Sequence, residues 1–180
     1  MRYITPVCLS VALSMVLWNA GGTVALADDD RNKEVVMLDN CEPTDPGWTP
    51  TGGCKLKPKQ ENMSASEFFE LLFSPLYPSE AVVGHPSWRN EPSYLSIDEG
   101  RRVRVRNRGG RGHTFTEVED FGGGFVPDLN GDLEQAPECL TGEVIVVEPG
   151  QRIQVRDLTP GLHKFQCCIH PWMRAAIRVE

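Results

Sequence analysis

The sequence predicts an all-β fold, a Greek-key β-sandwich, with an N-terminal extension that contains one short helix. Two observations lead to this fold class. Beyond residue 92, short stretches of alternating apolar and polar residues are separated by turns rich in glycine and proline, as in β-sandwiches. His113 and the cluster of cysteine, histidine and methionine at residues 167–173 also lie far apart in the sequence, and a sandwich of this type can bring such positions together.

The first 27 residues have the composition of a secretory signal peptide. Arg2 supplies a positive charge, residues 7–17 form an apolar run, and Ala25 and Ala27 flank a leucine in a small-x-small cleavage site. The run is too short for a membrane span, and no later segment approaches the roughly 20 apolar residues that a span requires. We therefore expect an exported protein, periplasmic or secreted, that is cleaved near Ala27 and has no membrane span.

The mature chain is acidic. Removal of 27 of the 180 residues leaves 153, and loss of Arg2 changes the net charge from −7 to −8. An acidic chain repels nucleic acid, so we expect no nucleic-acid partner. The length is sufficient for one domain, which we place at residues 93–180, after an extension at residues 28–92.

The extension carries no metal-site signature. A loop rich in proline and glycine runs between Cys41 and Cys54, and residues 64–67 (Ser-Ala-Ser-Glu) match a capping box before an apolar run. This pattern predicts a short amphipathic helix that ends before Pro75. His85 is either a spare metal ligand or a histidine with a structural hydrogen bond, and we favour the structural role.

Strand patterns begin at Ser93. In residues 101–108, Val103 and Val105 alternate with arginines, so the valines are expected on the buried face and the arginines on the solvated one. The other expected strands are 94–97, 143–147, 152–155 and 175–179.

The stretch from Phe165 to Met173 contains a thiol, an imidazole and a thioether at Cys167, His170 and Met173. These are donors that suit copper, and one further histidine would complete a His2Cys site with a weak axial methionine. Zinc sites usually show Cys-x2-Cys or His-x3-His spacing, which is absent here. The remaining alternative is a purely structural cysteine cluster.

The spacing Cys-x2-His-x2-Met, with Pro171 and Arg174 after the last two ligands, resembles the ligand loop of the cupredoxins, the small blue copper proteins. The loop is most like the short form of the amicyanin and plastocyanin type. The resemblance covers residues 93–180 and implies that His113 is the first ligand and that one copper ion (Cu⁺/Cu²⁺) binds per chain. The family usually has asparagine after this histidine, whereas this chain has Thr114.

The resemblance implies a type 1 copper protein that carries single electrons, is not an enzyme, and meets a redox partner protein transiently, with the chain a monomer. We expect the partner to contact an exposed edge of His170 within an apolar patch that includes Trp172. The alternative is a copper-binding protein for storage or delivery, although no Met- or His-rich tract is present. Further copper centres of the multicopper enzymes would require His-x-His pairs, which are also absent.

The cysteines predict two disulfides. Five cysteines remain after the signal peptide, and a metal-bound Cys167 explains the odd number. Neighbouring strand residues point to opposite faces, so Cys168 faces away from the metal. Cys41 and Cys54 are close in sequence, which leaves Cys139 as the partner of Cys168.

Overall fold

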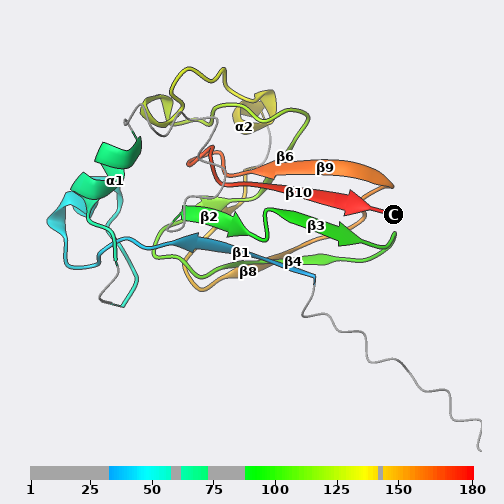
Figure 1. Cartoon of the computed structure of the whole chain (residues 1–180), viewed down its shortest axis with the longest axis horizontal. Helices are drawn as coiled ribbons and strands as arrows, with labels where there is room; N and C mark the ends of the chain where they lie inside the picture. The colour runs from blue at the N-terminus through cyan, green and yellow to red at the C-terminus, as the bar shows by residue number, and fades with distance from the viewer. Residues whose placement is uncertain (1–32, 58–61, 73–87, 142–143) are drawn as a thin grey trace, which may run out of the picture.

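The structure is a computed structural model that describes residues 33–57, 62–72, 88–141 and 144–180 (Figure 1). The expected signal peptide, the helix stop at Pro75 and His85 lie outside these residues. Within the described residues, no helix is long and apolar enough to cross a membrane.

Two four-stranded sheets form the sandwich that the sequence predicts (Figure 1). Two further short strands form a separate two-stranded pair. In order across the first sheet, the strands are β2 (Trp88–Glu91), β1 (Glu34–Asp39), β4 (Val103–Asn107) and β8 (Arg152–Val155). The second sheet contains β3 (Tyr94–Ile97), β10 (Arg174–Val179), β9 (Gly161–Gln166) and β6 (Thr116–Val118). The pair consists of β5 (His113–Thr114) and β7 (Val146–Val147).

Strand β4 shows the predicted alternation. Val103 and Val105 are fully buried, whereas Arg104 and Arg106 are partly exposed on the outer face. Burying each valine side chain contributes about 1.5–3 kcal/mol to stability. The same period-two pattern in β1 allows that strand to pair in parallel with β4 and antiparallel with β2.

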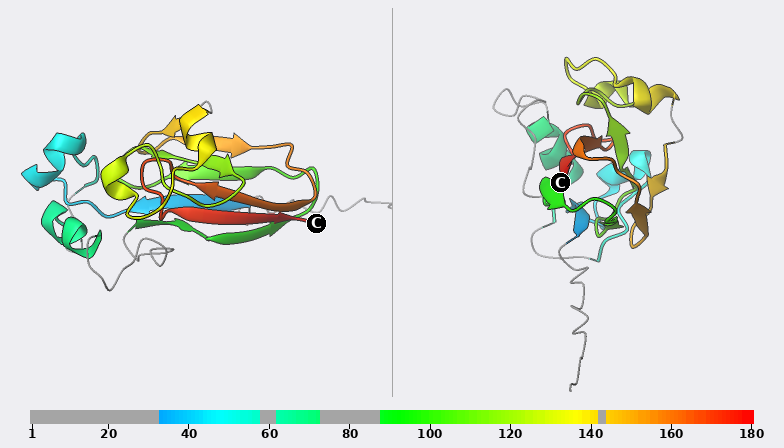
Figure 2. Two further views of the ribbon diagram at one scale, coloured as in Figure 1. Left: turned by 90° about the horizontal axis from the view of Figure 1, so that it is seen from above. Right: turned by 90° about the vertical axis from the view of Figure 1, so that its right-hand side faces the viewer.

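The stretch that we assign to an extension, residues 28–92, contributes two strands to the first sheet. Strand β1 lies between β2 and β4, in the interior of that sheet. Two described segments of this stretch, residues 41–57 and 62–72, form what we call the cap. Figures 1 and 2 show the cap beyond the strand ends, at the end of the sandwich where the chain passes from β9 to β10.

The cap contains the predicted helix, α1 (Ala65–Leu72), and a 3₁₀ helix, η2 (Pro46–Thr51). The capping box is confirmed, because the Glu67 backbone N–H donates to Ser64 Oγ at 3.2 Å and the Ser64 N–H donates to the Glu67 carboxylate at 2.9 Å. Trp48 of η2 packs on Phe68 of α1 with ring centroids 5.4 Å apart, which joins the two helices.

Both predicted disulfides are confirmed. Cys41–Cys54 closes the proline- and glycine-rich loop of the cap. Cys139, in α2 (Pro137–Thr141), is bonded to Cys168, which lies just beyond Cys167 in the loop after β9. A further 3₁₀ helix, η3 (Pro127–Leu129), lies between β6 and α2. Cys167 is the free cysteine among the described residues, and it is buried.

Candidate metal centre

The loop from β9 to β10 is closed by its own backbone. The Cys167 N–H donates to the Met173 carbonyl at 3.0 Å, and the Met173 N–H donates to the His170 carbonyl at 2.9 Å. The side chain of Asn90, from the first sheet, donates to the same Met173 carbonyl at 3.0 Å. These bonds hold the loop as a compact turn at the end of the sandwich.

The other predicted histidine is presented by the loop between β4 and β5. Buried Asn107 shapes this loop by donating to the carbonyls of Arg111 and Val147 and accepting from the Gly109 N–H. Gly109 packs against Asp39 so closely that a Cβ there would lie 1.9 Å from the carboxylate. The glycine-rich sequence therefore allows the loop to approach β1 and place His113 in the interior.

The structure brings His113, Cys167 and His170 together as a buried cluster. The two Nδ1 atoms lie 3.1 Å apart, and Cys167 Sγ lies 3.8 Å from His113 Nδ1 and 3.7 Å from His170 Nδ1. Metal bonds to imidazole nitrogen and thiolate sulfur are about 2.0–2.3 Å long, so a single ion can reach all three donors. The residues present therefore fit a trigonal His2Cys site.

Met173, the fourth predicted ligand, is fully buried in the same loop. Its backbone lies beside Cys167 and His170 through the two bonds described above. Its role as the axial thioether ligand stays a prediction.

The protein environment favours the thiolate form of Cys167. Burial raises the pKa of this thiol, but interactions with His113 and His170 outweigh burial and hold the pKa well below its usual range. The backbone N–H groups of Thr114 and His170 also point at Sγ, at 3.3 and 3.4 Å. A thiolate is the form that binds a metal ion.

The two ligand segments are joined through Thr114. Its hydroxyl oxygen accepts a hydrogen bond from the Cys168 N–H at 2.7 Å, and its own N–H faces Cys167 Sγ. Thr114 thus links the His113 strand to the cysteine loop.

Asp39, at the end of β1, was not identified from the sequence. Its carboxylate lies 2.7 Å from His113 Nε2 and accepts from the backbone N–H groups of Gly110 and Arg111 at 2.8 and 3.1 Å. Burial lowers the pKa of His113, yet the bonds to Asp39 and Cys167 raise it to about 9. Asp39 thereby fixes Nδ1 as the nitrogen that faces the cluster. The only sign of this role in the sequence around Asp39 is that an acidic residue stands at the end of an apolar run.

Aromatic side chains pack around His113 and His170. The Trp88 ring lies edge-to-face with His170 at 5.0 Å and with His113 at 6.0 Å, and Trp172 lies 5.6 Å from His170. Phe68 of the cap packs on Trp172 at 5.7 Å. The expectation that Trp172 borders an exposed edge of His170 is wrong, because the two residues are 2% and 4% exposed. Trp88 of β2 and Trp172 of the ligand loop contact the histidines directly, and Phe68 of the cap covers Trp172. Burial also lowers the pKa of His170.

His163, which lies four residues before Cys167, does not join the cluster. Its ring contacts the Glu117 carboxylate at 2.6 Å and the Thr159 carbonyl at 2.7 Å.

No protein-family model matches the chain, and no curated protein matches it. Among solved structures, it is similar to a purple cupredoxin from Nitrosopumilus maritimus at 19% identity and a TM-score of 0.37, over 57% of this chain and 94% of that one. It is also similar to a reduced Cu(I) form of an amicyanin variant at 22% identity and a TM-score of 0.35, over 51% of this chain and 73% of the other. By the order of its own strands, the chain is a β-sandwich of two four-stranded sheets with a buried His-Cys-His cluster, as the sequence resemblance to the cupredoxins implies.

Proposed function

We propose that this chain is an exported type 1 copper protein that carries one electron at a time through a site of His113, Cys167, His170 and Met173. The observation that carries the proposal is the cluster itself. One sulfur and two nitrogen donors from two distant segments lie within 3.8 Å of one another. This donor set is the one that copper prefers in electron-transfer sites.

The chain contributes a fixed and dry environment. A bound copper ion would supply a one-electron change of oxidation state. Asp39 holds the ring of His113, Thr114 links the two ligand segments, and the disulfide at Cys168 anchors the cysteine strand from its other face. Because these supports restrain both segments, the donors would keep their positions in either oxidation state, which favours rapid electron exchange.

The burial of the site argues against a role in storage or delivery. His113, Cys167 and Met173 are fully buried, and His170 is 4% exposed. A protein that hands its metal to another needs at least one ligand within reach of the receiving protein. The arrangement therefore favours a retained ion over a transferred one.

The test is the visible and EPR spectrum of the copper-loaded protein and of its Cys167→Ser variant. Wild type is expected to show the intense band of a copper–thiolate bond, and Cys167→Ser is expected to lose it, because serine offers no sulfur. Cys168→Ser is the matched control and keeps the band, since Cys168 faces away in a disulfide. A blue Cys167→Ser protein, or a colourless wild type that binds copper, would refute the proposal.

A further inference from the structure

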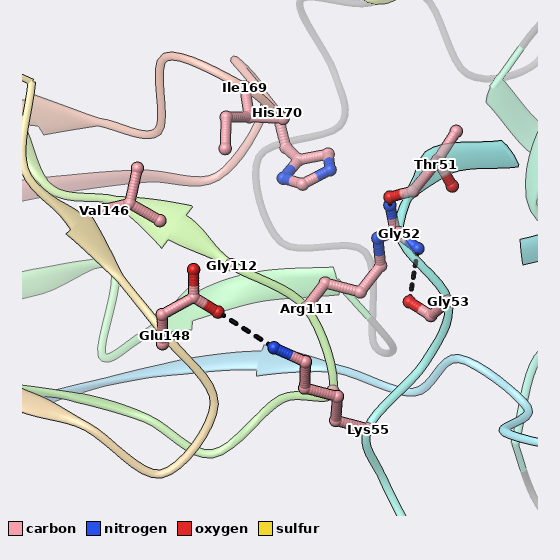
Figure 3. A pocket seen from close by; sticks show the side chains of 11 residues that line it. Thr51, Gly52, Gly53, Lys55, Arg111, Gly112, Val146, Glu148, Ile169 and His170 are labelled. Carbon is pink, nitrogen blue, oxygen red and sulfur yellow. Dashed lines mark hydrogen bonds and ion pairs between the residues drawn. The ribbon is translucent and has the colours of Figure 1, made fainter. Parts of the chain in front are cut away.

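A cleft of about 290 Å³ opens beside His170 (Figure 3). The cap forms one wall with residues 51–53 and Lys55, and the β7 region forms another with Val146 and Glu148. Ile169 and His170 line it from the ligand loop, and residues 110–112 line it from the loop before β5. The volume is near the lower end of the range for small-molecule sites, about 300–1,000 Å³. The cleft therefore has room for a small organic molecule.

The imidazole of His170 links this cleft to the candidate metal centre. Its Nδ1 atom faces Cys167 and His113, at 3.7 and 3.1 Å. The same ring lines the cleft, so its Nε2 edge is the one available there (Figure 3). In the part of the chain that the structure describes, no hydrogen bond to this Nε2 is found. When Nδ1 binds a metal, Nε2 carries a proton and can donate.

The charges around the cleft favour an anion. Lys55 and Arg111 are cationic, and Glu148 is the acidic residue among those that line it. Lys55 Nζ lies 3.3 Å from the Glu148 carboxylate, with both side chains about half exposed or more. Arg111 donates to the carbonyls of Gly53 and Thr51 and lies over Trp48, which holds its charge in place at the wall. The charged side chains that line the cleft therefore carry one net positive charge.

We propose that this cleft binds a small organic carboxylate. The carboxylate accepts a hydrogen bond from His170 Nε2, Lys55 and Arg111 offset its charge, and its hydrocarbon part contacts Val146 and Ile169. The inference rests on the proposed function only in giving His170 a metal to bind. A carboxylate at the outer nitrogen of a metal-bound histidine makes that ligand more basic. Binding therefore stabilises the oxidised ion and lowers the reduction potential of the centre.

The binding test is an NMR titration of the full mature chain with propionate, in the metal-free and the Cu(I)-loaded forms at constant ionic strength. Saturable shifts are expected at residues 51–55, 110–112 and 146–148. Propionamide, which has the same shape without the charge, is the control ligand and is expected to bind much more weakly.

Two substitutions move the charge of the cleft in opposite directions. Lys55→Gln removes a cation and is expected to weaken propionate binding about two- to fivefold, whereas Glu148→Gln removes the anion and strengthens it by a similar factor. Lys33→Gln makes the same charge change in a separate hollow lined by Arg102, Arg104 and Gln154, and is expected to leave the affinity unchanged. Equal binding of propionamide, or the same direction of change in both cleft variants, overturns the proposal.

Voltammetry separates this inference from the proposed function. Propionate is expected to lower the reduction potential of the copper-loaded protein in a saturable way, with the midpoint concentration found by NMR. A potential that does not respond overturns the contact with His170. If the chain binds propionate in the metal-free form but shows no copper–thiolate band, the carboxylate site is supported and the proposed function is refuted.

Discussion

Asp39→Asn tests whether the carboxylate of β1 holds the candidate metal centre in place. Asp39 is 1% exposed, and its carboxylate accepts hydrogen bonds from three N–H groups: His113 Nε2 and the backbone of Gly110 and Arg111. Asparagine has nearly the same shape but only one accepting oxygen. In either orientation, its NH₂ group faces at least one of these N–H donors.

The structure sets the size of the effect. A buried N–H group left without an acceptor costs about 1–3 kcal/mol, and the remaining bonds lose about 1 kcal/mol because the acceptor is no longer charged. We therefore expect Asp39→Asn to lower the free energy of unfolding by about 2–4 kcal/mol. That is a large part of the roughly 5–15 kcal/mol by which domains are stable. Loss of the carboxylate partner of His113 is also expected to weaken metal binding about 10- to 100-fold.

The assay is urea unfolding of the metal-free chain, followed by far-ultraviolet circular dichroism, with a chelator competition for metal affinity. Asp120→Asn is the matched control. Asp120 pairs with Lys164 at the surface with its side chain 86% exposed, so its loss is expected to change stability by less than about 1 kcal/mol. If Asp39→Asn unfolds like Asp120→Asn and binds metal like wild type, the role assigned to Asp39 is refuted.

Three further predictions concern other supports of the fold. Thr114→Val leaves the Cys168 N–H without its acceptor and is expected to lower the free energy of unfolding in urea by about 1–3 kcal/mol. Thr114→Ser keeps the hydroxyl and is the control. Equal stability of the two variants would contradict the link between the two ligand segments. Cys168→Ser opens a disulfide that spans 29 residues and is expected to lower the free energy of unfolding by about 3–4 kcal/mol. It is also expected to leave one titratable thiol at Cys139. A different free cysteine in peptide maps would show another pairing. His163→Gln is expected to destabilise the chain more at pH 5.5 than at pH 9. The hydrogen bond with Glu117 raises the His163 pKa, so its stabilisation is complete below the ordinary histidine pKa and disappears as the pH rises through the raised value. A pH-independent difference in melting temperature would count against this pair.

The parts of the site that could be predicted from the sequence are those whose geometry is local. The positions of Cys167 and His170 depend on a turn of a few residues, and their spacing carries that information. The pairing of Cys139 with Cys168 followed from strand alternation and from the odd number of cysteines. The strand pattern of Val103 and Val105 likewise depends only on period two.

The parts that could not be predicted depend on contacts between distant segments. Asp39 and His113 are 74 residues apart in sequence, and nothing near Asp39 indicates that β1 would pair with β4. The exposure of Trp172 was misjudged for the same reason. The loop sequence alone describes an apolar tip, whereas Phe68 of the cap lies against Trp172 and removes it from solvent.

The N-terminal segment is therefore part of the unit that forms the candidate metal centre. Strand β1 pairs with β4 over Glu34–Met37, and its buried Val35 and Met37 lie in the same core as Val103 and Val105. A unit that began at Ser93 would leave the backbone of β4 unpaired on that side and expose this apolar surface to water. It would also lose Asp39 from His113 and the aromatic cover from His170. We infer that β1 and the cap act together on the two histidines. Strand β1 fixes the ring of His113 through Asp39, and the cap packs Phe68 on Trp172 and lines the cleft beside His170.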